Sequence, residues 1–230
     1  MRERTLTMTF DAHDPALLAR FWGGLLGREA EGGFLPGDET QVSLRFVPSA
    51  TENSGLNRVH LHLTSESVED QAARVEQALR LGGSHLDVGQ LPEERHVVLA
   101  DPEGNEFCVI PPGNSFLAGC GLLGELACDG TRDVGVFWSA AMEWPLVWDD
   151  NEETAIQSPH GGTKVAWGGP PVTPKNGRNR QRFDITPAGG DQPAEVDRLI
   201  SLGATRVEVE ADGTVMLADP DGNEFRVLGS

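Results

Sequence analysis

The feature that most constrains this chain is an eleven-residue stretch that occurs twice. Residues 99–109 read LADPEGNEFCV and residues 217–227 read LADPDGNEFRV, so nine of the eleven positions are identical. The copies lie 118 positions apart in a chain of 230 residues, which indicates an internal duplication. In each copy, Asp-Pro and Gly-Asn favour a turn between two apolar strands. We therefore predict the same β-hairpin near the end of each half, with differences only at Glu103/Asp221 and Cys108/Arg226.

The patterns around the two hairpins repeat as well. In the first half, alternation and capping signals predict strands at 5–10, 30–34, 41–47, 58–63 and 84–88, a polar connection at 48–56, and helices that start after Asp14 and Ser67. The second half repeats the order, with helices at 134–142 and 193–202 and strands at 122–128, 146–148, 154–157, 164–167, 180–185 and 206–210. The predicted fold class is α+β: two tandem domains, residues 1–112 and 121–230, each built from two β-α-β-β-β-type units and joined by a linker at 113–120.

Composition limits the classes of partner. With 36 acidic and 18 basic residues, the chain carries a net charge of −18, which argues against nucleic acid and anionic membranes as partners. A plainer interpretation is that the charge makes a highly soluble cytoplasmic surface. No apolar run approaches the roughly 20 residues that a membrane span needs. The three cysteines lack a CxxC spacing, so we expect reduced thiols in the cytoplasm.

Short motifs at corresponding places in both halves accompany the hairpin. In the first half they are Asp14-Pro15, Phe21-Trp22, Asn57-Arg58-Val59-His60 and Leu81-Gly82, and in the second Phe137-Trp138, Asn179-Arg180 and Leu202-Gly203-Ala204. This combination resembles the vicinal oxygen chelate superfamily, which includes glyoxalase I, extradiol dioxygenases, fosfomycin-resistance enzymes and bleomycin-binding proteins. The chain is most similar to tandem glyoxalase-like domain proteins, which implies sheets curled into an open half-barrel with a ligand cleft.

The resemblance also implies positions for a divalent metal. Carried over to this chain, the metal-holding positions fall at about Thr7, at His60 and at Cys108, and in the second half at Arg182 and Arg226. Threonine and cysteine are poor ligands for hard cations, and arginine cannot ligate a metal. We therefore expect a small-molecule-binding protein without a metal or other cofactor. The alternatives are a lyase or dioxygenase that uses one divalent metal such as Zn, Fe, Mn or Ni, and a structural or partner-binding module.

His60 and His62 are the first candidates for a ligand site, because residues two apart on a strand share a face. With Glu106, they could hold zinc or iron. The plainer alternative places His60 in hydrogen bonds within the sheet and His62 at the rim of the cleft, and a third makes His60 a ligand contact or general base. Cys108 is either a nucleophile beside a histidine or a half-buried apolar residue.

Tryptophans and arginines complete the candidate list. Trp144, Trp148 and Trp167 either line the second cavity, where they would grip a planar ligand, or pack in the core. Arg182 and Arg226 either favour an anionic ligand or pair with Asp184 and Glu224.

Charge pairing and assembly give the last expectations. Arg58 with Glu106, and Arg180 with Glu224, recur in both halves and are predicted to form salt bridges within the sheets. We expect a monomer in which the two halves pair with each other, or a homodimer.

Overall fold

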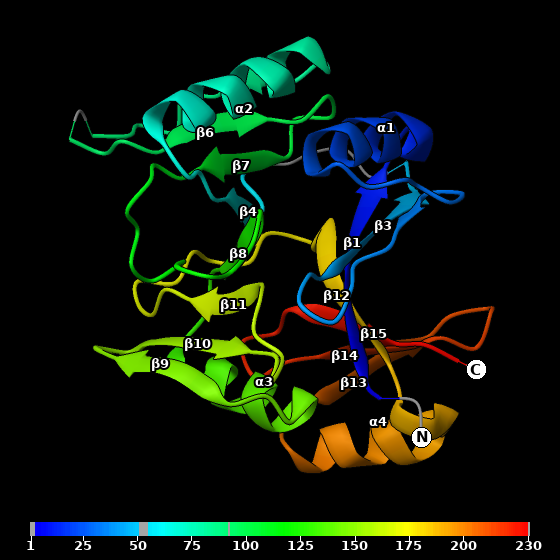
Figure 1. Ribbon diagram of the computed structural model, residues 1–230. Coiled ribbons are helices and arrows are strands. Elements are labelled where there is room, and N and C mark those ends of the chain that lie inside the picture. The colour runs from blue at the N-terminus through cyan, green and yellow to red at the C-terminus, as the bar shows by residue number, and fades with distance from the viewer. Residues whose placement is uncertain (1–2, 51–54, 92, 230) are drawn as a thin grey trace.

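The computed structural model describes residues 3–50, 55–91 and 93–229, so part of the predicted connection at 48–56 lies outside the described residues. The α+β fold is confirmed: these residues form four α-helices, one short 3-10 turn and two mixed sheets of seven and eight strands. Helices α1 and α2 lie at one end of the molecule and α3 and α4 at the other (Figure 1).

The element bounds follow the predicted order. The first half contains β1 (Thr5–Ala12), α1 (Pro15–Leu26), β2 (Phe34–Leu35), β3 (Ser43–Pro48), β4 (Val59–Leu63), α2 (Val68–Arg80), β5 (Ser84–His85), β6 (Val97–Ala100) and β7 (Glu106–Val109). The second half contains β8 (Leu123–Cys128), α3 (Arg132–Met142), β9 (Leu146–Asp150), β10 (Glu153–Gln157), β11 (Lys164–Trp167), β12 (Gln181–Thr186), α4 (Gln192–Ser201), β13 (Thr205–Val209), β14 (Val215–Ala218) and β15 (Glu224–Val227).

Local signals fix the helix ends. The Asp14 carboxylate accepts a hydrogen bond from the Leu17 N–H at 3.0 Å, and Gly27 ends α1 in the left-handed conformation. Ser67 caps α2 as predicted, because its hydroxyl accepts from the Asp70 N–H at 3.1 Å. The strand predicted at 30–34 is shorter than expected, because two consecutive glycines, Gly32 and Gly33, adopt positive φ there and turn the chain.

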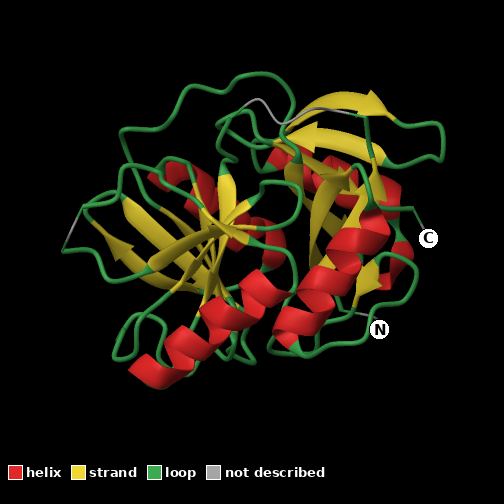
Figure 2. Ribbon diagram, turned by 90° about the horizontal axis from the view of Figure 1, so that it is seen from above, coloured by secondary structure: helices red, strands yellow, loops and turns green. Residues whose placement is uncertain are grey.

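Each sheet combines one unit from each half. The seven-stranded sheet has the order β13-β14-β15-β12-β1-β3-β2, and the eight-stranded sheet has the order β5-β6-β7-β4-β8-β11-β10-β9 (Figure 1). The central pairs, β1 with β12 and β4 with β8, are antiparallel and join the halves. Hydrogen bonds between strands therefore connect the two halves within each sheet. Viewed from above, the two sheets lie apart from each other (Figure 2).

Aromatic packing joins the two units within each half. The Trp22 ring on α1 lies 5.0 Å from the Phe107 ring of the hairpin, and its indole N–H donates to the Asp101 carboxylate at 3.1 Å. The second half repeats these contacts with Trp138, Phe225 and Asp219 at 4.9 and 3.3 Å. The repeated sequence is thus a structural device that holds a helix of one unit to the hairpin of the next.

Glu103 and Asp221 differ between the hairpin copies but play the same structural role. Glu103 accepts from the backbone N–H groups of His13 and Asp14 at 2.9 and 2.6 Å. Asp221 accepts from the backbone N–H and hydroxyl of Thr131 at 2.7 and 3.1 Å. Both carboxylates therefore secure the corner that leads from a central strand into its helix. None of the helices in the described part of the chain is both long and apolar enough to span a bilayer.

Candidate functional site

A cavity of about 490 Å³ opens on the inner face of the eight-stranded sheet, which is the face opposite the core residues Leu61 and Leu63. We call it the histidine cleft. Strand pairing places His62 beside Cys108 on one side and beside Glu125 on the other. The cleft is lined by His60, His62, Phe116, Glu125, Ala127, Cys128, Asp129, Trp148, Glu153, Thr154, Ala166, Trp167 and Gly168.

His62 is held between a carboxylate and a thiol. Its Nδ1 lies 2.6 Å from Glu125 Oε2, so the ring N–H donates to the carboxylate. Burial by itself would lower the pKa of His62, but hydrogen bonds to Cys108 and Glu125 outweigh burial and raise the pKa to about 9. The metal-free site therefore holds a protonated imidazole at neutral pH.

His60 has the opposite protonation state, although it shares the strand and the face. Its ring centre lies 4.8 Å from that of His62. Burial, followed by the charges of His62 and His96, lowers the pKa of His60 to about 3. His60 thus presents a neutral imidazole that can donate from one nitrogen and accept at the other.

Glu125 is a site residue that the sequence analysis missed. It lies at the position where the 118-residue offset between the hairpins places the counterpart of Thr7, and both residues lie on the central strand of their unit. The 118-residue offset could therefore have identified Glu125 from the sequence. The register also shows that the carried-over position on β4 is His62 rather than His60, because His62 is the residue paired with Cys108.

The matching inner face of the seven-stranded sheet is filled with ion pairs. Arg226 makes two hydrogen bonds to the Asp184 carboxylate, one of them at 2.8 Å from Nε. Arg182 pairs with Asp11 at 2.7 Å. The alternative in which these arginines pair with Asp184 and Glu224 holds only for Asp184, which pairs with Arg226; Arg182 pairs with Asp11, and Glu224 pairs with Lys175. Because both guanidinium groups are buried and paired with carboxylates, their use as contacts for an anionic ligand is not supported.

The three candidate tryptophans have different surroundings. Trp148 is 43% exposed, and its ring packs edge-on against the Phe116 ring at 5.8 Å, so the two rings line the histidine cleft together. Trp167 is among the lining residues of the cleft, but it is 2% exposed and belongs to the core. Trp144 is half-buried and lines a different cavity. The structure therefore brings one of the three into the histidine cleft as an accessible aromatic face.

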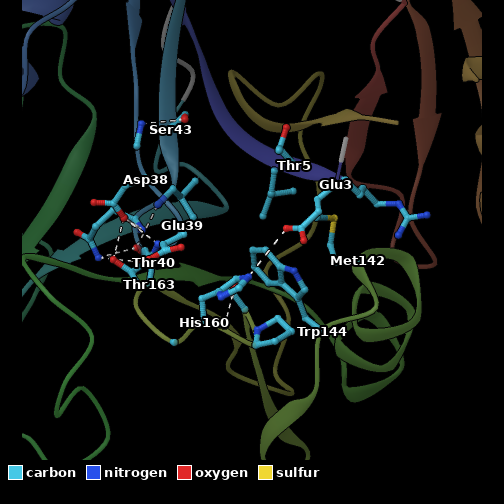
Figure 3. Close-up of a pocket in the computed structure, with 18 of the residues that line it drawn as sticks. Glu3, Thr5, Asp38, Glu39, Thr40, Ser43, Met142, Trp144, His160 and Thr163 are labelled. Atoms are coloured by element: carbon cyan, nitrogen blue, oxygen red, sulfur yellow. Dashed lines mark hydrogen bonds and ion pairs between the residues drawn. The ribbon is translucent and has the colours of Figure 1, made fainter. Parts of the chain in front are cut away.

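That second cavity, of about 840 Å³, lies between the two halves. Trp144, His160 and Glu3 lie on one side of it, and Asp38, Glu39 and Thr40 on the other (Figure 3). Several of its polar groups are already paired. The Asp38 carboxylate accepts from Thr40 and Gln41, and His160 lies 3.9 Å from Glu3. We therefore place the candidate site in the histidine cleft, where unlike titratable groups converge.

Glu106 does not join the histidines. Its carboxylate accepts from the backbone N–H and the side-chain amide of Asn57, the latter at 2.9 Å. The metal set His60/His62/Glu106 is therefore wrong, and Cys108 is the third residue of the cluster. Cys108 itself is buried in a small apolar cluster with Val98, Ile110, Leu117 and Cys120.

The predicted salt bridges Arg58–Glu106 and Arg180–Glu224 are also wrong. Glu224 pairs with Lys175 at 2.5 Å and accepts from the Asn179 backbone N–H at 3.3 Å. In both halves, the asparagine before the arginine donates its backbone N–H to the glutamate. A backbone N–H donor next to the arginine therefore occupies the carboxylate in each half.

The duplicated units, the sheets assembled from both halves and the cleft on the inner face of one sheet are typical of the vicinal oxygen chelate superfamily. A family model described as a glyoxalase-like domain matches the chain twice, over residues 7–110 and 125–228. The chain therefore belongs to the glyoxalase-like domain family and contains two such domains in tandem. A search of curated protein sequences found no match.

Solved structures with the same fold extend over nearly the whole chain. Glyoxalase I from Zea mays is 13% identical, with a TM-score of 0.61, and the match covers 98% of this chain and 93% of the maize chain. A candidate dioxygenase from Bacillus subtilis is also 13% identical, with a TM-score of 0.59 and coverage of 98% and 86%. At this identity, the likeness establishes the fold.

The cleft residues fit a transition-metal ion. One ligand atom from each of His60, His62 and Cys108 lies within 4.8 Å of the others. Tetrahedral zinc sites hold such atoms about 3.5 Å apart, so the side chains would need to approach by about 1 Å. Glu125 already orients His62 through Nδ1, as outer-shell carboxylates do for metal-binding histidines. The thiolate and imidazole set suits zinc, iron(II) or nickel better than manganese.

Proposed function

We propose that this protein binds a small molecule in the histidine cleft without a metal. The observation that carries the proposal is the contrast between the two sheets. The inner face of one sheet is filled by buried ion pairs, and that of the other opens into a cavity of about 490 Å³. A pocket of this size, with an aromatic wall and a few converging polar groups, is typical of sites for small ligands.

The lining indicates the class of ligand. Trp148 and Phe116 offer flat apolar surfaces, and the neutral His60 offers one donor and one acceptor. Asp129 and Glu153 add negative charge at the cleft, and no lysine or arginine is among its lining residues in the described chain. These groups favour a flat, neutral or cationic ligand that carries hydrogen-bond donors.

A screen by thermal shift and tryptophan fluorescence tests this proposal. The probes are planar neutral and cationic compounds, with planar carboxylates as the opposite-charge set. Trp148→Ala should weaken binding of a hit about tenfold through loss of aromatic contact. Trp144→Ala, in the separate cavity, is the matched control and should leave the affinity unchanged. If no compound binds, or if Trp144→Ala is equally damaging, the structural or partner-binding alternative takes the place of this proposal.

A metal-dependent lyase or dioxygenase is the second candidate, and the His60, His62 and Cys108 cluster favours it. These three residues would hold the ion, with Glu125 orienting His62. A bound ion would supply Lewis-acid polarisation of a substrate oxygen or an activated water. Two solved structures with the same fold are named as glyoxalase I and as a dioxygenase. These names make a metal-dependent enzyme worth testing.

Elemental analysis separates the two candidates. The metal-free proposal expects less than about 0.1 metal ion per chain, because protonated His62 must lose a proton before it can ligate. About one zinc, iron or nickel per chain in the wild type, lost in Cys108→Ser and His60→Ala, would establish the second candidate instead. Cys128→Ser, a buried thiol outside the cluster, is the control.

We further propose a cytoplasmic monomer. The three cysteines are free and buried, which suits a reducing compartment. Each sheet already pairs strands from both halves, so the chain completes its sheets without a second copy.

A further inference from the structure

A small cavity beside the N-terminal ends of β4 and β12 has three arginines among the described residues that line it. It has a volume of about 40 Å³ and is lined by Arg58, Arg178, Arg180, Gln181, Asn57, Asn176 and Asn179 together with Gly55 and Leu56. Among the described residues, no aspartate or glutamate lines it, although acidic residues outnumber basic ones by 36 to 18 in the chain. The composition of this lining is therefore opposite to that of the molecule.

The strongest indication of a bound ligand comes from the Arg180 side chain. It is 5% exposed, and its Nε and Nη1 are buried and have no hydrogen-bond partner among the described residues. Its Nη2 lies 3.4 Å from the Asp11 carbonyl oxygen and 3.9 Å from a Glu103 oxygen. A buried charge with unpaired donors is costly, so a group that accepts these donors would stabilise the folded state.

Two neighbouring residues also have buried polar atoms that lack a partner in the described part of the chain. They are Arg58, at Nε, and Gln181, which is 2% exposed, at its amide nitrogen and its amide oxygen. Arg178 lies at the rim with 43% of its side chain exposed, where it also pairs with Glu208 and Glu210 at 3.5 Å. Three residues that line this cavity therefore have unpartnered donors, which suit a ligand that accepts hydrogen bonds, and two of the three carry a positive charge.

We propose that this cavity, the arginine pocket, binds a small oxyanion such as inorganic phosphate or the carboxylate of formate. The planar guanidinium group donates two parallel hydrogen bonds to oxyanions, which suits the free Nε and Nη1 of Arg180. A cavity needs about 10–15 Å³ to hold one water. At about 40 Å³, the pocket holds a larger group than one water. The site does not depend on the function of the histidine cleft.

Thermal shift in a zwitterionic buffer tests the pocket, with sodium phosphate, formate and chloride as probes. The wild type should be stabilised by phosphate or formate at lower concentration than by chloride, because only the oxyanions use the bidentate geometry. Arg180→Gln should weaken the apparent affinity at least about tenfold, since bonds to charged groups are lost. Arg80→Gln is the control, because the Arg80 side chain is 67% exposed, lies outside the pocket lining and pairs with Glu76 at 3.5 Å.

A second variant keeps the proposal testable if Arg180→Gln does not fold. Arg178→Gln at the rim should fold and weaken the oxyanion response, whereas Arg80→Gln should not. If the wild type and both pocket variants respond equally to every salt, or if a crystal grown with phosphate shows only water beside Arg180, the pocket is not an anion site. A preference for phosphate over formate would identify a tetrahedral anion as the ligand, and the reverse would identify a carboxylate.

Discussion

Two histidines on the same strand take opposite protonation states because their neighbours differ. His62 has an acceptor on each side, Cys108 and Glu125, and its pKa rises to about 9. His60 faces burial and the charge of His62, and its pKa falls to about 3. The cleft thus offers one cationic and one neutral imidazole over a wide range around neutral pH.

The first prediction concerns Glu125. Glu125→Gln removes the carboxylate that lies 2.6 Å from His62 Nδ1, so the pKa of His62 should fall by at least about one unit. The measurement is an NMR titration of the imidazole protons with a chelator present. Glu153→Gln, which alters a second carboxylate of the same cleft, should leave this pKa nearly unchanged. An unaltered His62 pKa in Glu125→Gln would show that Cys108 alone raises it.

The second prediction concerns stability against pH. The pKa of His62 is higher in the folded protein than the ordinary 6.5, so its stabilisation is complete below pH 6.5 and is lost as pH rises through about 9. The loss amounts to about 3 kcal/mol. For His60, whose pKa is lowered to about 3, stability is lost as pH falls below 6.5. The measurement is the melting temperature against pH.

Two variants show which histidine causes the loss of stability at acid pH and which causes the loss at alkaline pH. His62→Gln should flatten the decline between pH 6.5 and 9, and His60→Gln should reduce the decline on the acid side. Equal slopes in wild type and His62→Gln would contradict the assignment of the raised pKa to His62.

At the scale of elements, each repeated hairpin connects the two units of its half. Asp101 accepts from the Trp22 indole and from the backbone and side chain of Asn105, all of them buried groups. Asp101→Ala should therefore lower the free energy of unfolding by about 3 kcal/mol, because several buried donors lose their acceptor. Chemical denaturation measures this, and Asp197→Ala on the exposed face of α4 is the control, with a change within about 0.5 kcal/mol.

A loss below about 1 kcal/mol in Asp101→Ala would mean that the hairpin does not hold α1 in place. The matched substitution Asp219→Ala should behave alike, since Asp219 makes the same contacts to Trp138 and Asn223.

The elements that could be predicted from the sequence are those fixed by neighbours along the chain. Caps at Asp14, Gly27 and Ser67, and the turn at Asp101, depend on residues within four positions. The site could be predicted only in part. His60 and His62 follow from alternation, but Glu125 contacts His62 through strand pairing, and the two residues are 63 positions apart in the sequence. The ion pair predicted for Glu106 failed because a nearby backbone N–H, that of Asn57, competes for its carboxylate.

At the scale of the molecule, the two halves depend on each other. The central strand pairs β1–β12 and β4–β8 both cross between halves, so residues 1–112 or 121–230 alone would expose two strand edges. We predict that neither half is a stable monomer, whereas co-expressed halves associate. Size-exclusion chromatography with light scattering measures this. A half that unfolds cooperatively as a monomer would contradict the prediction and support independent domains.

The central claim is that one sheet provides the ligand cleft while the other is closed by its own ion pairs. A crystal structure of the protein with a compound selected by thermal shift tests it most directly. We predict electron density for the compound between Trp148 and His62, with Arg226–Asp184 and Arg182–Asp11 intact. Density for the compound against Arg182 and Asp184, with those ion pairs broken, would contradict the account.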